Sequence, residues 1–341
     1  MVLDIMGEGR LMPAPDCDCV LVNAKSQYMK PNKSWVLGRL VRDHEKEKEE
    51  AWRKDHGESK ERPSMTISFY KTSVKTDKYT QGVPALDWIY WMGAATIVVQ
   101  LAIAVIPGAV DQDWTILTVT IIGNILALIG GAIPKWEQEK WNCRSSKGDK
   151  DHTVICLTRG VGYKDVMVII SEGKGQYRLE DIANARDRPV KWTFLMSIIL
   201  CIAQILLLLI VAGLNKHAWF LLAIGALGIV QNSVAAGYRR DLHTSGIHLE
   251  PFLEKGDKGV VAHERKVMKA LQEAEKMEPY VGISLLQVFF PGDNLLPEEE
   301  AWRKRTIKDL KPADKENPGM VIPNEARNSG DIGVQGAAST N

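Results

Sequence analysis

The stretch Trp88–Val110 reads WIYWMGAATIVVQLAIAVIPGAV, and its 23 residues include no Asp, Glu, Lys or Arg. Three more stretches of 20, 22 and 21 residues are equally free of charge: Trp114–Ile133, Thr193–Leu214 and Ala218–Tyr238. About 20 apolar residues at 1.5 Å each cross the hydrocarbon core of a bilayer. Because soluble proteins rarely exclude charge over this length four times, the sequence predicts four transmembrane helices in two hairpins.

The remaining sequence is highly charged, although the average composition looks ordinary at 45% hydrophobic residues. The chain of 341 residues holds 43 Lys and Arg against 42 Asp and Glu. Because these charges are confined to the residues outside the four stretches, a single soluble domain is excluded. Their near balance excludes a nucleic-acid-binding protein that works through bulk charge, so we expect no nucleic-acid partner. Since the chain opens MVLDIMGEGR, we expect no signal peptide, and the first span serves as signal and anchor.

The distribution of Lys and Arg predicts the orientation of the spans. Segment Lys135–Trp192 contains twelve of them, whereas Asp111–Asp113 contains none and Asn215–His217 contains only Lys216. Loops rich in Lys and Arg stay in the cytosol. We therefore expect a multi-pass membrane protein with both termini and the middle segment in the cytosol. Glycosylation of the sequon at Asn32 would contradict this topology.

The predicted fold is an α-helical membrane protein with four transmembrane helices, a small α/β cytosolic insert and an amphipathic C-terminal helix. The expected regions are a partly disordered cytosolic N-terminal region (1–87), transmembrane hairpin 1 (88–134), a cytosolic insert with a β-hairpin (135–192), transmembrane hairpin 2 (193–238), a cytosolic C-terminal helical region (239–310) and a disordered tail (311–341).

The insert carries a β-hairpin pattern. Thr153–Leu157 and Val166–Ile170 are rich in β-branched residues, and the turn Arg159–Tyr163 between them contains two glycines. Leu179–Arg186 is typical of a short helix. Before the first span, Met65–Tyr70 favours an extended segment.

Three other segments outside the spans have helical or apolar patterns. Arg39–Arg62 is dense in both charges and indicates a solvated helix or a disordered run. Val260–Met277 has the pattern of an amphipathic helix. Tyr280–Phe290 is apolar but too short to span a bilayer, so we expect it to dock on the membrane or on the bundle.

Each span contains a side-chain amide. Gln100, Asn124 and Gln204 lie near the midpoints of the first three spans, and Gln231 and Asn232 lie about one turn to the cytosolic side in the fourth. Amides in hydrocarbon need partners, which predicts a hydrogen-bonded layer across the bundle. The layer either holds the helices together or forms a polar path for a solute. We favour the first, because the spans lack the charge that carriers usually contain.

Small residues predict close helix packing on the second span. Gly123, Ala127 and Gly131 recur every four residues, which gives one face where another helix can approach closely.

The hexapeptide EEAWRK occurs twice, at Glu49–Lys54 and at Glu299–Lys304. Helical spacing pairs each Glu with a basic residue four positions later. Trp52 and Trp302 are then left to contact another surface. The repeat is either a duplicated docking motif or two similar helical turns.

Catalytic and metal-binding patterns are missing, so we predict no catalytic residue, no metal and no cofactor. His263-Glu264 opens a zinc-protease pattern, but Val267 occupies the position of the second His. Cys17-Asp18-Cys19 has no second cysteine pair nearby, which favours free thiols.

The stretches QNSVAAGYRR at Gln231–Arg240 and SGIHL at Ser245–Leu249 resemble an uncharacterised fungal family of multi-pass integral membrane proteins. Pro279–Leu286, the FFPG at Phe289–Gly292 and the hairpin Thr158–Ile170 are similar as well. The resemblance covers roughly residues 86–300. It implies an integral membrane protein with a cytosolic insert, and it supplies no catalytic residue.

The sequence favours a non-enzymatic accessory or scaffold protein at a membrane. Its expected partners are the lipid bilayer and either a cytosolic protein or a second copy of the chain. One alternative is a small-solute transporter that uses the intramembrane amides. A second alternative is a membrane enzyme acting on a hydrophobic substrate at the cytosolic face.

Overall fold

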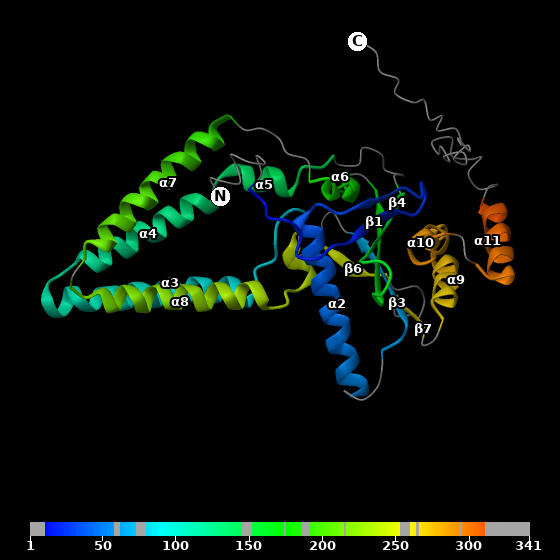
Figure 1. Cartoon of the computed structure of the whole chain (residues 1–341), viewed down its shortest axis with the longest axis horizontal. Helices are drawn as coiled ribbons and strands as arrows, with labels where there is room; N and C mark the ends of the chain where they lie inside the picture. Colours follow the sequence, from blue (N-terminus) through cyan, green and yellow to red (C-terminus); the bar gives the residue numbers. More distant parts are fainter. Residues whose placement is uncertain are drawn as a thin grey trace, which may run out of the picture.

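The computed structural model describes residues 11–57, 62–72, 80–144, 152–173, 175–185, 191–214, 216–252, 260–263, 266–292 and 295–310. A group of long helices extends from one side of a sheet domain (Figure 1). The tail predicted to be disordered, 311–341, lies outside the described residues.

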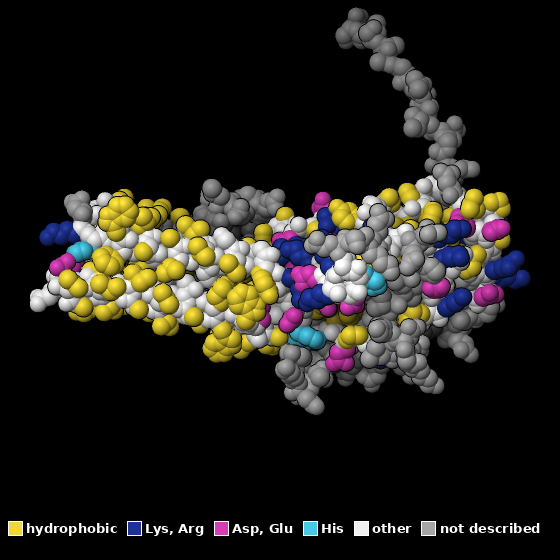
Figure 2. Space-filling model, turned by 90° about the horizontal axis from the view of Figure 1, so that it is seen from below, with side chains coloured by type: hydrophobic (Ala, Val, Ile, Leu, Met, Phe, Trp, Pro, Cys, Tyr) yellow, Lys and Arg dark blue, Asp and Glu magenta, His cyan; other side chains and the backbone are white. Residues whose placement is uncertain are grey.

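Four of the described helices are long and apolar enough to cross a membrane. They are α3 (Trp88–Asp111), α4 (Thr115–Gly131), α7 (Lys191–Ala212) and α8 (Ala218–Gly237), and the second candidate span runs from α4 on to Lys140. Their bounds agree with the predicted spans to within two residues. At most 22% of the apolar window of any span is buried. Figure 2 shows the resulting apolar surface, which ends at a belt of charged side chains beside the sheet domain.

Most of the packing among the four helices is between a helix of hairpin 1 and a helix of hairpin 2. Helix α3 packs against α4 and α8, and α4 also packs against α7. The pairs α3–α8 and α4–α7 diverge toward the sheet domain (Figure 1). A short helix, α5 (Pro134–Lys140), follows α4 after Ile133.

The sheet has seven described strands in the order β2-β1-β4-β5-β3-β6, with β7 pairing on β3 beside β6. These strands are β1 (Val20–Asn23), β2 (Met29–Pro31), β3 (Met65–Thr72), β4 (His152–Thr158), β5 (Asp165–Glu172), β6 (Leu249–Pro251) and β7 (Val260–His263). Only the β3–β5 pair is parallel. The predicted hairpin is present as β4 and β5, and Gly160 and Gly162 of its turn have positive φ angles of 87° and 93°.

The prediction of a small α/β insert was too narrow. Strands β1 to β3 precede the first hairpin, β4 and β5 lie between the hairpins, and β6 and β7 follow the second. The regions 1–87, 135–192 and 239–310 therefore contribute to one mixed sheet and are not separate units. Local patterns revealed several strands but not their pairing, which joins residues up to about two hundred positions apart.

Helices cover both faces of this sheet. Helices α9 (Val267–Met277) and α10 (Val281–Phe289) bury one face around Phe69 and Val168. Helices α2 (Trp35–His56) and α6 (Leu179–Ala183) bury the other around Leu37 and Ile169. Burial on both faces explains why β4 and β5 are continuously apolar instead of alternating. A short 3₁₀ helix, η1 (Leu242–Ser245), connects α8 to β6.

Two predictions for the C-terminal region need correction. Val260–Met277 is not one amphipathic helix, because Val260–His263 pairs with β3 as strand β7 before α9 begins. Tyr280–Phe290 does not dock on the membrane or the bundle. It forms α10, where Val281, Leu285 and Leu286 belong to the core of the sheet domain.

The charged N-terminal run also differs from the expectation. Its residues up to His56 belong to α2, which starts four residues earlier than predicted, at Trp35. Val36, Leu37, Leu40 and Val41 are buried, whereas the helix is mostly exposed from Glu50 onward. The first half of the helix is therefore part of the core and is not simply solvated.

Candidate functional site at the junction of the spans and the sheet domain

Helix α2 caps the end of the last span. The final carbonyls of a helix have no partner within the helix. The Arg39 guanidinium donates hydrogen bonds to three carbonyl oxygens at the end of α8, those of Ala235 (3.3 Å), Ala236 (3.2 Å) and Tyr238 (3.2 Å). A cation at this end also interacts favourably with the helix dipole. The sheet domain is thus attached directly to α8.

Two carboxylates hold the arginines of α2 in place. Asp16 lies 3.2 Å from Arg39 and 2.7 Å from Arg42. Asp43 lies 3.3 Å and 3.1 Å from the same two guanidinium groups. The Trp35 indole N–H donates to Asp16 at 3.0 Å. This network contains two positive and two negative charges, so each of its arginines is already neutralised.

A second ion pair joins the first and last spans. Arg240 donates to both carboxylate oxygens of Asp87, at 2.7 and 2.8 Å. Asp87 also caps the N-terminus of α3 by accepting from the backbone N–H of Tyr90 at 3.0 Å. The hydrogen bond from Arg240 holds the pKa of Asp87 below its usual value. The ion pair fixes the position of α3 relative to the segment after α8.

A pocket of about 510 Å³ lies between these ion pairs. We call it the junction pocket. Its walls come from the first half of α2, the end of α8, the end of α5, the segment around η1 and the segments just before β1 and α3. The lining residues are Asp16, Trp35, Val36, Arg39, Leu40, Asp43, Pro84, Lys140, Ala235, Ala236, Arg240, Asp241, Leu242, Thr244 and Ser245. It therefore lies at the end of α8, between this span and the sheet domain.

Two charged groups in the junction pocket have no ionic partner among the described residues. The Lys140 ammonium lies 4.8 Å from the ring centroid of Trp141, and Arg240 is close enough for its like charge to act on Lys140. The exposed Asp241 carboxylate has no ion pair or hydrogen bond within the described part of the chain. Neither residue belongs to a recognisable sequence motif. The only feature of the sequence that could have indicated them is that each is a charged residue a few positions after the end of a predicted span.

The intramembrane amides do not form the predicted layer. The Gln100 amide donates to the backbone carbonyl of Ile224 on α8 at 3.0 Å. The Asn124 amide nitrogen is buried without a hydrogen-bond partner in the described structure. Gln204 is exposed on α7, and Asn232 is exposed on α8. Depth alone suggested a layer, but rotation of each helix about its axis decides where an amide points.

Helices α3 and α8 instead contact each other through two pairs, in each of which a side-chain amide of one helix lies over a glycine of the other. A Cβ atom built on Gly228 of α8 would lie 3.3 Å from the Gln100 amide nitrogen. A Cβ atom built on Gly93 of α3 would lie 3.5 Å from the amide nitrogen of Gln231. Each helix thus places a glycine beneath the amide of its antiparallel neighbour. This reciprocal arrangement explains the close pairing of α3 and α8.

The predicted small-residue face of α4 is used only in part. A Cβ atom on Gly123 would lie 3.5 Å from the Leu207 side chain of α7. Ala127 is exposed, and a Cβ atom on Gly131 would meet no atom within 4 Å. The divergence of the helices in Figure 1 agrees with this loss of contact.

The two copies of EEAWRK are both helical but have different surroundings. In α2, Glu49 pairs with Arg53 at 2.7 Å, and the Trp52 ring stacks on His56 with centroids 3.7 Å apart. The second copy belongs to α11 (Pro297–Leu310), where Trp302 packs against the core of the sheet domain.

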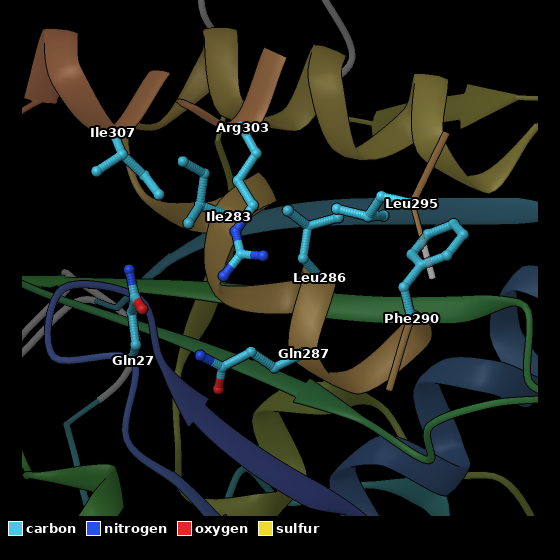
Figure 3. Close-up of a pocket in the computed structure, with 8 residues that line it drawn as sticks. All are labelled: Gln27, Ile283, Leu286, Gln287, Phe290, Leu295, Arg303 and Ile307. Atoms are coloured by element: carbon cyan, nitrogen blue, oxygen red, sulfur yellow. The ribbon is translucent and has the colours of Figure 1, made fainter. Parts of the chain in front are cut away.

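Figure 3 shows that Arg303, also in the second copy, points toward α10 beside Ile283, Leu286 and Gln287. These residues line a small cavity of about 40 Å³ under α11. The second copy is therefore engaged within the chain itself, and the two tryptophans do not occupy equivalent positions.

No group of three or more His, Cys, Asp or Glu in the described structure is arranged to hold a metal ion. Cys17 and Cys19 are buried free thiols, and the Cys17 thiol donates to the carbonyl of Gly38 at 3.2 Å. Burial lowers the pKa of His44 to about 3, so this imidazole is neutral in the folded protein near pH 7. Its edge contacts the Tyr70 ring.

We find no family model, curated protein or solved structure that matches this chain.

Proposed function

We propose that this protein is a non-enzymatic accessory or scaffold protein that holds a folded domain at the cytosolic face of a membrane. The observation that carries the proposal is the sheet, in which segments before, between and after the two hairpins pair as neighbouring strands. A single sheet requires all three segments to be on one side of the membrane. Since the segment between the hairpins has twelve Lys and Arg, that side is the cytosol.

The attachment between the domain and the spans supports a scaffold. Arg39 binds the end of α8, and Arg240 binds Asp87 at the start of α3. These contacts hold the domain at one height and one orientation above the bilayer. A flexible linker would allow a wide range of positions. Fixed presentation of a surface is useful to a protein that positions a partner at a membrane.

The positions of the amides argue against a solute path. A path would need polar groups that converge inside the bundle. Gln204 instead faces outward on α7, and Gln100 is engaged by the carbonyl of Ile224. The membrane location agrees with the resemblance to fungal multi-pass membrane proteins, which is itself a prediction.

Cysteine labelling tests the orientation. Asp111→Cys lies at the tip of hairpin 1 and Lys308→Cys on α11, both at exposed positions. We expect a membrane-impermeant maleimide to label Lys308→Cys only from the cytosolic side and Asp111→Cys only from the opposite side, beyond the background of the parent chain. The reverse pattern would refute the orientation. The Asn32 sequon is a poor reporter, since Asn32 is buried and hydrogen-bonded to Ser34.

Affinity purification from native membranes tests the scaffold. We expect a stoichiometric cytosolic protein with the wild-type chain and with the control Gly225→Ala, whose new methyl group meets no atom within 4 Å. Gly282→Val should release it, because the substitution disrupts the sheet domain while leaving the spans intact. Saturable solute uptake in proteoliposomes, with no stoichiometric partner, would contradict the proposal and favour a transporter.

A further inference from the structure

The junction pocket has the size and position of a lipid site. Its volume of about 510 Å³ falls in the range of about 300–1,000 Å³ typical of small-ligand pockets. Ala235 and Ala236, at the end of α8, form part of its wall. The end of a membrane span lies at the level of the lipid headgroups. A headgroup can therefore enter this pocket from the bilayer without the lipid leaving the membrane.

The charges in the pocket are balanced but not all paired. Three cations and three carboxylates line it: Arg39, Lys140, Arg240, Asp16, Asp43 and Asp241. Asp16 and Asp43 engage Arg39, while Arg240 is engaged by Asp87 just outside the lining. Lys140 and Asp241 remain, one of each sign, without an ionic partner in the described structure. A ligand that carries one negative and one positive group would satisfy both.

We propose that the junction pocket binds the headgroup of a zwitterionic phospholipid, with Lys140 contacting the phosphate and Asp241 contacting the headgroup ammonium. A singly charged anion would satisfy Lys140 but leave the Asp241 carboxylate of the same pocket without a counter-charge. A phosphodiester bearing an ammonium group matches the balanced lining. The contact of Lys140 with the phosphate is a charge-assisted hydrogen bond, which is the strong kind in protein recognition. Asp241 attracts the ammonium through its charge, so this contact does not require an N–H on the headgroup.

Native mass spectrometry of the purified full-length protein tests the proposal. The probes are dihexanoyl phosphatidylcholine, dihexanoyl phosphatidylethanolamine, dihexanoyl phosphatidic acid and inorganic phosphate. We expect the two zwitterionic lipids to bind at least tenfold more tightly than the other two probes. Equal binding of inorganic phosphate would assign the pocket to free phosphate, and tighter binding of phosphatidic acid would refute the role of Asp241.

Three variants separate the two contacts, and two more serve as controls. Lys140→Gln should weaken all probes at least tenfold, and Lys140→Arg should retain most of the affinity because it keeps the charge. Asp241→Asn should weaken only the zwitterionic lipids. The matched controls Lys308→Gln and Asp309→Asn remove exposed charges from α11 and should leave every affinity unchanged. Wild-type affinity in Lys140→Gln, with an unchanged melting temperature, would overturn the proposal.

Discussion

Arg240, which lies just after the last span, forms a two-point ion pair with Asp87, the residue immediately before the first. The two residues are 153 positions apart in the sequence, and both hairpins lie between them. Because Asp87 also caps the N-terminus of α3, the same carboxylate both stabilises the start of the first span and binds the residue that follows the last span. The pair therefore joins the ends of the membrane region at the surface where the sheet domain is attached.

Arg240→Gln should lower the free energy of unfolding by about 1–2 kcal/mol, since it removes a charged, partly buried hydrogen-bonded pair. The pair lowers the folded-state pKa of Asp87, so its contribution is present above the unfolded value of about 4 and is lost as the pH falls through the folded value. The difference in melting temperature between wild type and variant should shrink below about pH 4. A difference independent of pH would show that Arg240 acts by another route.

Gln100→Leu should destabilise the bundle by about 0.6–2 kcal/mol, because it removes the hydrogen bond to Ile224 that joins α3 to α8. Gln204→Leu is the matched control. Since Gln204 is exposed on α7, an apolar replacement there should leave stability unchanged or raise it. Thermal unfolding in one detergent would compare the two. Equal destabilisation by both substitutions would argue for the amide layer that the structure lacks.

Gly282→Ala should destabilise the sheet domain by about 3 kcal/mol or more, through a clash between α10 and α9. The new Cβ atom would lie 2.2 Å from the carbonyl oxygen of Leu271, and helix backbone cannot shift easily. Gly123→Ala is a milder comparison, with its nearest contact at 3.5 Å on the Leu207 side chain. Urea unfolding of both variants measures the difference, and a normal midpoint for Gly282→Ala would contradict the close packing.

Trp302→Ala should destabilise α11 by about 2 kcal/mol, whereas Trp52→Ala should have little effect on stability. The reason is that Trp302 packs against the core of the sheet domain, whereas Trp52 stacks on His56 in a largely exposed part of α2. Hydrogen exchange would report faster opening of Pro297–Leu310 in the first variant. If the two variants lost self-association equally, despite their unequal effects on stability, the result would support the hypothesis that both copies of EEAWRK are docking motifs.

His44→Phe should flatten the pH dependence of stability between about pH 6.5 and pH 3. The folded-state pKa of His44 is lowered from 6.5 to about 3 by burial, with a smaller effect of Lys48. The unfolded chain therefore binds a proton in this range that the folded chain does not, so stability falls as the pH falls. Phe keeps the edge contact with Tyr70 without titrating. An unchanged pH profile in the variant would show that other groups control acid unfolding.

The sequence alone determined the four spans and the hairpin of the insert. Each depends on local composition: a helix that spans a bilayer needs about 20 consecutive apolar residues, and Val166–Ile170 has the β-branched composition of a strand. The same local rules produced the errors at Val260–Met277 and Tyr280–Phe290. The first contains a strand only because β3 offers an edge for pairing, and the second is buried only because the sheet provides a face.

Only the tertiary structure decided which of the polar residues act together. Gln100 and Gln204 have the same local pattern, yet helix rotation turns one toward Ile224 and the other outward. The junction pocket gathers Asp16, Lys140 and Asp241 from three segments separated by the spans. No local signal predicts such a site, because its geometry arises when distant strands pair and bring the three segments to the same end of the helices.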